Sequence, residues 1–503
     1  MRLHWQRAVD EARAITQSWN QPGQPGGAIT LFDSEQIRAA CCGGLADLAQ
    51  QTPFTTQSVV RFASVTKHLF ASLVTGAASS QLALTDPLSR HLPQLTGENG
   101  KVTVGQALDM TSGLPDVRES LSLLGLSVYN ATSADSLLAF LADNGCLNYP
   151  AGSEISYTNT GYRLVEEALK AKGIYFADLL RQHINQPLGI ALSAPETWFD
   201  IVPGLVPGYW PSPQGWQLSC AGLHLSTSGC VAGSVRDLTV WLQSLLMNQG
   251  PGEGVLARLS QPRCLSDGRV TGYGLGVAHS RIGDALLVGH GGSHAGYKSY
   301  FLLDPVLQVG VALVANREDV ATYDSVLRVM SALLDQPLPA RGHDLTPGLY
   351  AAEQGGHWLE VKGPGACWLG AIETLYRSET PGVTVSLSSH LPMKLRQHGM
   401  AIEGEIGHAP CRFLPVEADN SVAQLQGRWY WPDTRSELVI DGDSIVMGLG
   451  PAAIAGSLQS LGNGRALATV QDGPWEKRFS LLVQDGYLTL LLNRSRVVRY
   501  QRG

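Results

Sequence analysis

Ser64 and Lys67 are the residues of this sequence whose types and spacing most directly suggest chemistry. Three residues make about one helical turn, so a helix that begins at Ser64 would carry both side chains on one face. A serine at a helix N-terminus lies in the positive end of the helix dipole, which favours an alkoxide. Burial disfavours the ammonium form of a lysine, which can then act as a neutral base. The pair therefore predicts a nucleophilic serine that needs no catalytic histidine.

The same spacing also fits a plain structural role, in which Ser64 caps a helix and Lys67 is solvated. Phe70, Leu73 and Val74 argue against that alternative, because they make the predicted helix strongly apolar. A lysine on such a helix is unusual unless it has a specific function. The tetrad alone does not decide between the two interpretations.

Tyr157 and Asn159 form a second group of residues that could take part in chemistry. A turn built on Pro150 and Gly152 precedes them, and their alternation in an extended segment would direct both side chains the same way. A tyrosine could transfer a proton there and an amide could bind a carbonyl. The structural alternative is a turn tyrosine followed by an asparagine that caps a helix from residue 161.

A third group, His290-Gly291-Gly292-Ser293, directly follows a predicted strand over residues 285–289. Glycines beside a strand allow a substrate backbone to approach closely. His294-Ala295-Gly296 repeats the same pattern, so His294 remains an alternative to His290. We prefer His290 because it stands immediately behind the predicted strand.

The elements that would hold these groups come from both ends of the first 336 residues. We predict helices over residues 4–19, 64–77, 161–172, 234–247 and 320–334, and strands over residues 28–32, 36–42, 273–277, 285–289, 300–303 and 309–315. Helices and strands at both ends favour one sheet that is built from distant segments and covered by helices, which is an α+β arrangement.

The pattern changes after Pro337, where helical periodicity nearly disappears. Leu349-Tyr350 and Trp429-Tyr430 lie in two similar openings, each followed by short strands and glycine turns. This pattern predicts two small antiparallel, lipocalin-like β-barrels in tandem. The predicted domains are residues 1–336, 343–420 and 424–503.

Composition excludes several classes of function. The 503-residue chain has a net charge of −7, which argues against nucleic acid as a partner. It has no apolar run of the roughly 20 residues that a membrane span needs, and no apolar segment near Met1 that would indicate secretion. We therefore expect a cytoplasmic protein without a membrane partner. Its eight cysteines lack metal-binding spacing, and we expect neither a metal nor a cofactor.

Taken in order, Ser64-x-x-Lys67, Tyr157-x-Asn159 and His290-x-Gly292 resemble the motifs of the penicillin-recognising serine hydrolases. That superfamily contains class C β-lactamases, D,D-carboxypeptidases, related esterases and D-aminopeptidases. The likeness covers roughly residues 15–330. The third motif departs from the β-lactamase pattern, since His290 replaces a lysine that holds a substrate carboxylate. A neutral histidine there weakens the case for a substrate with a free carboxylate and favours the D-aminopeptidase branch.

The resemblance implies a role for each matching position. Ser64 would attack the scissile carbonyl, Lys67 would take its proton and Tyr157 would protonate the leaving amine. Asn159 would bind the acyl side, and His290 would orient the substrate and the Tyr157 hydroxyl. The backbone N–H groups of Ser64 and Ser293, beside Gly292, would form the oxyanion hole.

The implied reaction removes an N-terminal D-amino acid from a small peptide, amide or ester. β-Lactams are then expected inhibitors, and a homodimer is compatible with the resemblance. The alternatives are an esterase, a D,D-peptidase or a weak β-lactamase on the same scaffold. From another class of function, a penicillin sensor or ligand-binding protein would bind without turnover.

An aminopeptidase must also recognise a cationic amine, and a buried cation needs a paired anion. The resemblance implies that a loop of the last β domain supplies it. The matching segment is 470–476, in which Asp472 is the expected carboxylate and Glu476 the second choice. The structural alternative is an Asp-Gly turn that merely joins two strands.

Overall fold

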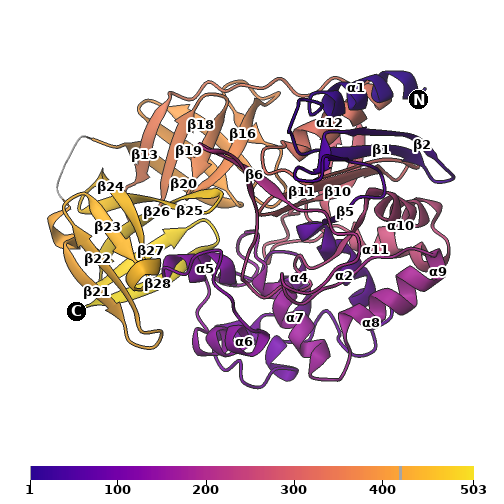
Figure 1. Cartoon of the computed structure of the whole chain (residues 1–503). Helices are drawn as coiled ribbons and strands as arrows, with labels where there is room; N and C mark the ends of the chain where they lie inside the picture. Colours follow the sequence, from indigo (N-terminus) through magenta and orange to yellow (C-terminus); the bar gives the residue numbers. More distant parts are fainter. Residues whose placement is uncertain (1, 418–421) are drawn as a thin grey trace.

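A six-stranded antiparallel sheet connects the two ends of the first 334 residues (Figure 1). The computed structural model describes residues 2–417 and 422–503. The strand order is β2-β1-β12-β11-β10-β9. The strands are β1 (Gly27–Asp33), β2 (Ile37–Gly43), β9 (Ala278–Ile282), β10 (Ala285–His294), β11 (Tyr297–Asp304) and β12 (Val309–Ala315). The β1–β12 pairing aligns Gly27 with Ala315, so the sheet forms only when the beginning and the end of the first 334 residues come together.

Each face of this sheet is buried by a different set of helices. Ile29 and Leu31 lie in an apolar cluster with α1 (Trp5–Gln17) and α12 (Thr322–Leu334). Their neighbours Ala28 and Phe32 lie in the larger cluster on the other face, which also contains α2 (Thr66–Thr75). The period of two along β1 thus divides its side chains between two cores.

The segment between β2 and β9 is mainly helical. Its remaining helices are α3 (Glu98–Lys101), α4 (Val104–Leu108), α5 (Val117–Leu123), α6 (Ala134–Asp143), α7 (Thr160–Lys170), α8 (Phe176–Leu180), α9 (Gln186–Leu188), α10 (Val235–Met247) and α11 (Val255–Leu259). Its short strands are β3 (Leu45–Asp47), β4 (Thr52–Pro53), β5 (Val59–Arg61), β6 (Tyr209–Ser212), β7 (Gly215–Leu218) and β8 (Ala232–Ser234).

Two closed eight-stranded barrels follow. The first contains β13 (Gly348–Ala352), β14 (Trp358–Lys362), β15 (Gly365–Trp368), β16 (Ala371–Arg377), β17 (Thr384–Ser386), β18 (Met393–His398), β19 (Ala401–Ile406) and β20 (Ala409–Pro415). The second contains β21 (Gly427–Trp431), β22 (Ser436–Asp441), β23 (Ser444–Met447), β24 (Ile454–Gly462), β25 (Arg465–Asp472), β26 (Trp475–Gln484), β27 (Tyr487–Leu492) and β28 (Ser495–Arg502). The predicted α+β domain followed by two antiparallel barrels is confirmed.

The second barrel packs directly against α5 (Figure 1). The Tyr500 hydroxyl donates to the Leu123 carbonyl at 3.0 Å, and the Ser120 and Ser495 hydroxyls lie 2.8 Å apart. One apolar cluster joins α5 residues with buried residues of β27 and β28. The domain boundaries at 336, 343 and 424 stay a proposal because the cores are shared, and the boundary at 420 lies outside the described residues.

One predicted strand is wrong. Residues 273–277 form a turn, in which the Gly274 N–H donates to the Val277 carbonyl at 2.8 Å. Gly276 has a φ of +71°, and a Cβ there would meet the Lys67 carbonyl oxygen at 2.6 Å. Glycine is therefore needed where this turn passes α2. The strand over residues 285–289 continues instead to His294, so that the third motif lies inside β10.

Among the described residues, no helix combines the length and the apolar character that crossing a membrane would require.

Candidate active site

Ser64 lies in a 3-10 turn, η1 (Ala63–Val65), that leads directly into α2. The predicted helical setting of Ser64 and Lys67 is therefore present. Ala63 has a φ of 50°, in the left-handed region that costs a residue with a side chain of order 1 kcal/mol or more. Ser64 is half-buried and Lys67 is completely buried, so Lys67 is not the solvated lysine of the structural alternative.

The Lys67 amine has three oxygen partners. Its Nζ lies 2.8 Å from Asn159 Oδ1, 2.6 Å from the Ser228 carbonyl oxygen and 3.2 Å from Ser64 Oγ. An amide oxygen and a carbonyl oxygen can only accept hydrogen bonds, and a neutral amine has two N–H groups. Both N–H groups are therefore used, and the lone pair of a neutral Lys67 faces Ser64.

Burial favours this neutral form. The pKa of Lys67 lies well below its usual value of 10.5, chiefly because burial disfavours the ammonium. The charge of Asp116 acts in the opposite direction, while Arg494 and Arg118 lower the pKa further. Desolvation and two nearby guanidinium groups thus outweigh one carboxylate.

Asp116 fixes the orientation of the Asn159 amide. Its Oδ2 accepts from Asn159 Nδ2 at 2.8 Å and from the Asn159 backbone N–H at 2.7 Å. The amide nitrogen must therefore face Asp116 and the amide oxygen must face Lys67. Asn159 stands before α7 but makes no side-chain capping bond, so the capping alternative does not apply.

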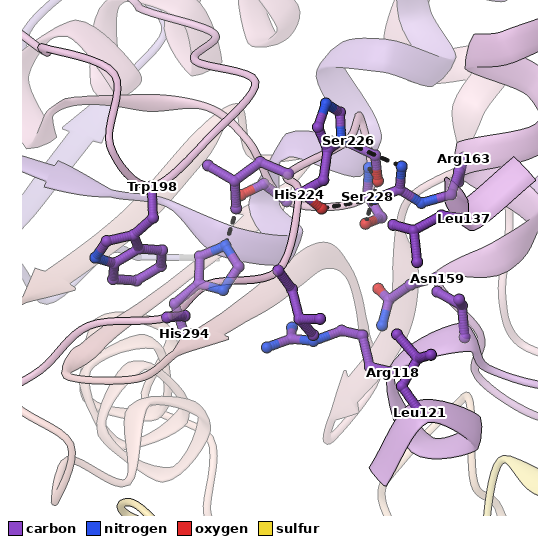
Figure 2. A pocket seen from close by; sticks show the side chains of 15 residues that line it. Arg118, Leu121, Leu137, Asn159, Arg163, Trp198, His224, Ser226, Ser228 and His294 are labelled. Carbon is purple, nitrogen blue, oxygen red and sulfur yellow. Dashed lines mark hydrogen bonds between the residues drawn. The ribbon is translucent and has the colours of Figure 1, made fainter. Parts of the chain in front are cut away.

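Asn159 also lies on a narrow cavity, together with Ser228, Arg163 and His294 (Figure 2). One N–H of its amide is left after the bond to Asp116. This N–H is available to the acyl side of a substrate, and its binding by Asn159 stays a prediction.

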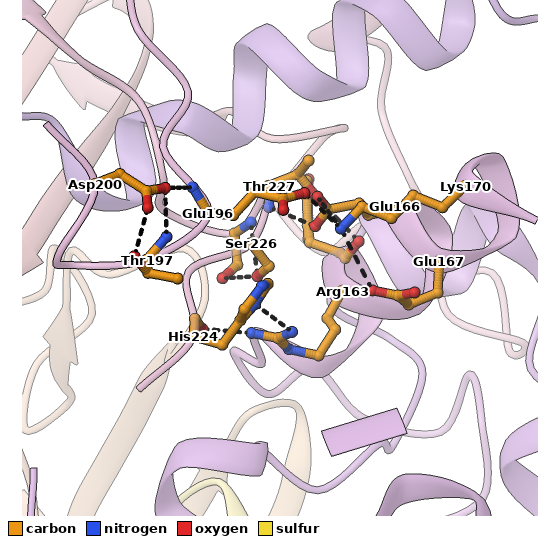
Figure 3. A network of polar contacts seen from close by, with 12 residues as sticks. Arg163, Glu166, Glu167, Lys170, Glu196, Thr197, Asp200, His224, Ser226 and Thr227 are labelled. Carbon is orange, nitrogen blue, oxygen red and sulfur yellow. Dashed lines mark hydrogen bonds and ion pairs between the residues drawn. The ribbon is translucent and has the colours of Figure 1, made fainter. Parts of the chain in front are cut away.

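The segment from His224 to Thr227, which precedes Ser228, is held by a polar network on α7 (Figure 3). Glu166 accepts from the Thr227 backbone N–H at 2.9 Å, and Arg163 donates to the His224 carbonyl at 2.7 Å. Lys170 lies 3.4 Å from Glu166 and completes the charge balance of this carboxylate. This network fixes the segment that ends at Ser228, and with it the second acceptor of Lys67.

Tyr157 lies against Lys67, with the lysine Nζ 4.7 Å from the centre of its ring. Its hydroxyl is buried and makes no hydrogen bond. Burial raises the Tyr157 pKa, although the nearby Ser64 hydroxyl acts to lower it. The phenol therefore remains protonated and keeps a proton that it can donate.

His290 contacts Tyr157 through its ring, with 6.1 Å between the ring centres. Its Nε2 pairs with the Tyr273 hydroxyl at 2.8 Å and its Nδ1 with the Gly291 carbonyl at 2.6 Å. Because a carbonyl only accepts, Nδ1 carries the proton and Nε2 accepts from Tyr273. Both ring nitrogens are thus occupied, and His290 can orient Tyr157 through ring packing.

His294 lies elsewhere, on the wall of the narrow cavity beside Trp198 (Figure 2). Its Nε2 pairs with the Gly229 carbonyl at 2.7 Å. The packing against Tyr157 favours His290 as the histidine of the third motif, and this assignment remains a prediction.

Gly292 brings β10 against the serine turn. A Cβ at this position would lie 2.0 Å from the Phe62 carbonyl oxygen, so only glycine permits the contact. The pairing of β10 with β9 ends at Gly289, so the part of β10 that carries Ser293 lies beyond the pairing with β9. An oxyanion hole formed by the backbone N–H groups of Ser64 and Ser293 is compatible with this arrangement and stays a prediction.

The barrels contribute two residues that the sequence did not suggest. The His390 ring, from the first barrel, lies 5.1 Å from the Tyr157 ring, and the Arg494 guanidinium, from the second, lies 4.6 Å above it. Burial lowers the pKa of His390 to about 3, and the charges of Arg494 and Lys67 add to this effect. No local pattern identifies either residue. Asp116, by contrast, has a readable signal, since it follows a proline and caps α5.

Asp472 does not have the position that we predicted. It ends β25 in a tight hairpin, and its carboxylate accepts from the Ser127 hydroxyl at 2.6 Å and from Lys477 at 2.6 Å. It is buried and does not line either cavity beside Asn159. Asp472 therefore anchors the hairpin, whereas Glu476 lines a larger cavity of about 320 Å³.

Comparisons with known proteins agree with this geometry. A family model described as Beta-lactamase matches residues 12–333, more than half of the chain. The chain belongs to the beta-lactamase family. Within this family it is 24% identical over 355 residues to the D-aminopeptidase of Brucella canis, which covers 69% of this chain and 65% of that relative. The D-aminopeptidase of Cereibacter sphaeroides is 23% identical over 437 residues, covering 83% and 81%.

Solved structures share the fold over about two thirds of this chain or over nearly all of it. The D-amino acid amidase from Ochrobactrum anthropi SV3 complexed with D-phenylalanine has a TM-score of 0.55 at 21% identity and covers 65% of this chain and 99% of its own. The octameric penicillin-binding protein homologue from Pyrococcus abyssi has a TM-score of 0.54 at 17% identity and covers 98% and 97%. At these identities the likeness concerns the fold.

Proposed function

We propose that this protein is a serine hydrolase that forms an acyl-enzyme on Ser64. The observation that carries the proposal is the contact of Lys67 Nζ with Ser64 Oγ at 3.2 Å, made by an amine whose two other partners, Asn159 Oδ1 and the Ser228 carbonyl, can only accept. A neutral Lys67 therefore has its lone pair for Ser64. A base that is fixed in this way can remove the serine proton without a histidine.

The reaction then has two steps. Ser64 Oγ attacks the substrate carbonyl while its proton passes to Lys67, and Tyr157 gives its proton to the leaving amine as the C–N bond breaks. Water subsequently attacks the acyl carbonyl and gives a proton to the Tyr157 phenolate, and the protonated Lys67 returns its proton to Ser64 Oγ as the bond between Ser64 Oγ and the acyl carbon breaks. Lys67 and Tyr157 are close enough for their titrations to be coupled, so the proton assignments belong to the pair.

The proposed substrates are D-aminoacyl peptides, amides or esters from which the N-terminal D-residue is removed. The D-aminopeptidases and the D-amino acid amidase among the relatives support this class. Glu476 on the larger cavity supplies a carboxylate for a free amine in place of Asp472. β-Lactams remain proposed inhibitors, and the octameric homologue makes self-association of this chain worth measuring.

The test compares the wild type with Ser64→Ala and with Ser72→Ala, a second serine of α2 whose hydroxyl bonds the Leu69 carbonyl. We expect Ser64→Ala to lose both labelling by a fluorophosphonate and hydrolysis of D-alanine p-nitroanilide, while Ser72→Ala keeps both. Normal activity of Ser64→Ala would overturn the proposal.

The choice of substrate has its own readout. The D-alanine substrate should be hydrolysed faster than its L-isomer, and the free amine should be preferred over the N-acetylated form. Faster turnover of a short ester or a cephalosporin would favour the esterase or β-lactamase alternative. A stable label without turnover would favour a penicillin sensor.

A further inference from the structure

The larger cavity lies between α5 and the second barrel, next to the proposed reaction centre. Asn159 and Ser293 line it from the side of Ser64, and Trp475 and Arg494 line it from the barrel. Its volume of about 320 Å³ leaves room for a substituent of a substrate that is bound at Ser64. The charges on its wall therefore bear on which substituent it accepts.

Two carboxylates of this wall, Asp116 and Glu119, are already engaged. Asp116 accepts from Asn159 and from the first backbone N–H groups of α5. Glu119 accepts from the Arg494 backbone N–H at 2.6 Å, and burial raises its pKa to about 7. Glu476 is the carboxylate of the wall that remains exposed.

Two of the four cations of the wall are also paired. Lys477 lies 2.6 Å from Asp472, and Arg478 forms an ion pair with Glu360. The other two are Arg118 and Arg494, which come from α5 and from the turn between β27 and β28.

Within the described part of the chain, Arg118 has no carboxylate partner, and Arg494 has only a distant one. Among residues 2–417 and 422–503, no carboxylate lies within ion-pair distance of Arg118. Arg494 approaches Glu119 only at 3.9 Å, and its Nε is buried without a hydrogen bond. Figure 2 shows the Arg118 side chain extending across the narrow cavity toward His294.

Holding two such cations together is unfavourable. Both guanidinium groups are half-buried, so an unpaired charge there still carries part of the cost of burial, and like charges add repulsion. Burial lowers the pKa of Arg118, and the charge of Arg494 lowers it further against the effect of Asp116. A guanidinium binds a carboxylate in a planar, two-pronged geometry, so one anion between the two arginines would relieve both costs.

We propose that Arg118 and Arg494 bind a carboxylate on the acyl part of the substrate. This inference rests on the proposed function, and it names the preferred D-aminoacyl substrates as acidic ones. The carboxylate belongs to an acidic D-side chain or to a carboxyl-bearing N-acyl group. In the third motif, His290 replaces the lysine that would bind a carboxylate on the leaving group of the substrate. Arg118 and Arg494 would instead bind a carboxylate on the acyl part, from the wall of the larger cavity.

Two matched substrate pairs test the proposal and show whether the carboxylate belongs to the side chain or to the N-acyl group. The α-p-nitroanilides of D-glutamate and D-glutamine differ only in a side-chain carboxylate. N-succinyl- and N-acetyl-D-alanine p-nitroanilide differ by a carboxylate on the N-acyl group. We expect the wild type to prefer the acidic member of at least one pair by tenfold or more in kcat/KM, chiefly through KM.

The variants are Arg118→Gln, Arg494→Gln and the charge-preserving Arg494→Lys, with Arg281→Gln as an exposed control on β9. The backbone bonds of Arg494 to Asp116, Asn148 and Glu119 do not depend on its side chain, so Arg494→Gln should fold. Each Gln variant should lose most of the preference, Arg494→Lys should retain part of it and Arg281→Gln all of it.

The outcomes separate this inference from the proposed function. Equal rates within both pairs, or a preference that survives both Gln variants, would overturn the carboxylate site while Ser64 labelling stays intact. If no p-nitroanilide is turned over, protection of Ser64 from the fluorophosphonate is compared within each pair, and equal protection likewise overturns the site. If the fluorophosphonate does not label Ser64 in the wild type, the proposed function itself is overturned.

Discussion

At the scale of single residues, the chemistry depends on a chain of hydrogen bonds with one allowed direction. Asp116 can only accept, so Asn159 turns its amide nitrogen toward it and its oxygen toward Lys67. The lysine then presents its lone pair to Ser64. Each link excludes one alternative orientation of the next residue, which is why no histidine is needed to position the base.

The pH dependence of Ser64 acylation follows from the state of Lys67. Lys67 must be neutral to accept a proton, and burial places its pKa well below the usual 10.5. Acylation should therefore be fast above this lowered pKa and be lost as the pH falls through it. The rate of Ser64 labelling by a fluorophosphonate, measured against pH, should have its midpoint below the ordinary lysine range.

The same labelling experiment on Lys67→Ala should show almost no reaction, with circular dichroism confirming the fold. A midpoint near 10.5 for the wild type, or a rate without pH dependence, would contradict a buried neutral base.

At the scale of elements, α5 connects stability with the site. Asp116 caps this helix by accepting from the Arg118 and Glu119 N–H groups, and the same carboxylate holds Asn159. The helix also carries Arg118 toward the larger cavity and packs against β28. A change at its capping residue, Asp116, therefore affects the base, the cavity and the barrel contact together.

Asp116→Ala should lower both stability and activity. Loss of the cap costs about 1 kcal/mol, and each Asn159 donor left unpaired costs a further ~1–3 kcal/mol. Ser64 acylation should fall at least tenfold, because Asn159 no longer orients Lys67. Urea unfolding and fluorophosphonate labelling measure the two effects.

Ser133→Ala is the matched control, since Ser133 caps α6 in the same way but is exposed. It should lose about 1 kcal/mol and keep the wild-type acylation rate. Equal loss of acylation in both variants would mean that capping alone, and not the hold on Asn159, explains the effect of Asp116.

At the scale of the whole molecule, the barrels and the beta-lactamase-like region form one structure. A single apolar cluster contains residues of α2, α5, β27 and β28, and a second cluster joins the two barrels. His390 and Arg494 extend this continuity to the surroundings of Tyr157. The barrels therefore help to shape the candidate site as well as to cover it.

Unfolding of the three regions should be coupled. Leu490→Ala in β27 and Leu313→Ala in β12 each remove a completely buried side chain, at a cost of ~2–5 kcal/mol. Both substitutions should shift two probes to lower urea by the same amount: the loss of Ser64 labelling and the loss of amide protection in β24–β28. If either substitution shifts only the probe of its own region, the barrel unfolds independently.

The sequence by itself determined the chemical groups and the classes of element. Ser64 and Lys67 share a helix face, Tyr157 and Asn159 share an extended segment, and short strands with glycine turns predicted the barrels, because these features depend on neighbours in the chain. The turn at residues 273–277 was misjudged, since its glycines serve a contact with α2 that local patterns do not reveal. Asp116 on Asn159, His390 and Arg494 around Tyr157, and the anchoring role of Asp472 were decided only by tertiary structure. Each depends on a contact between segments far apart in the chain, and which such segments meet is set by the packing of the shared cores rather than by local sequence.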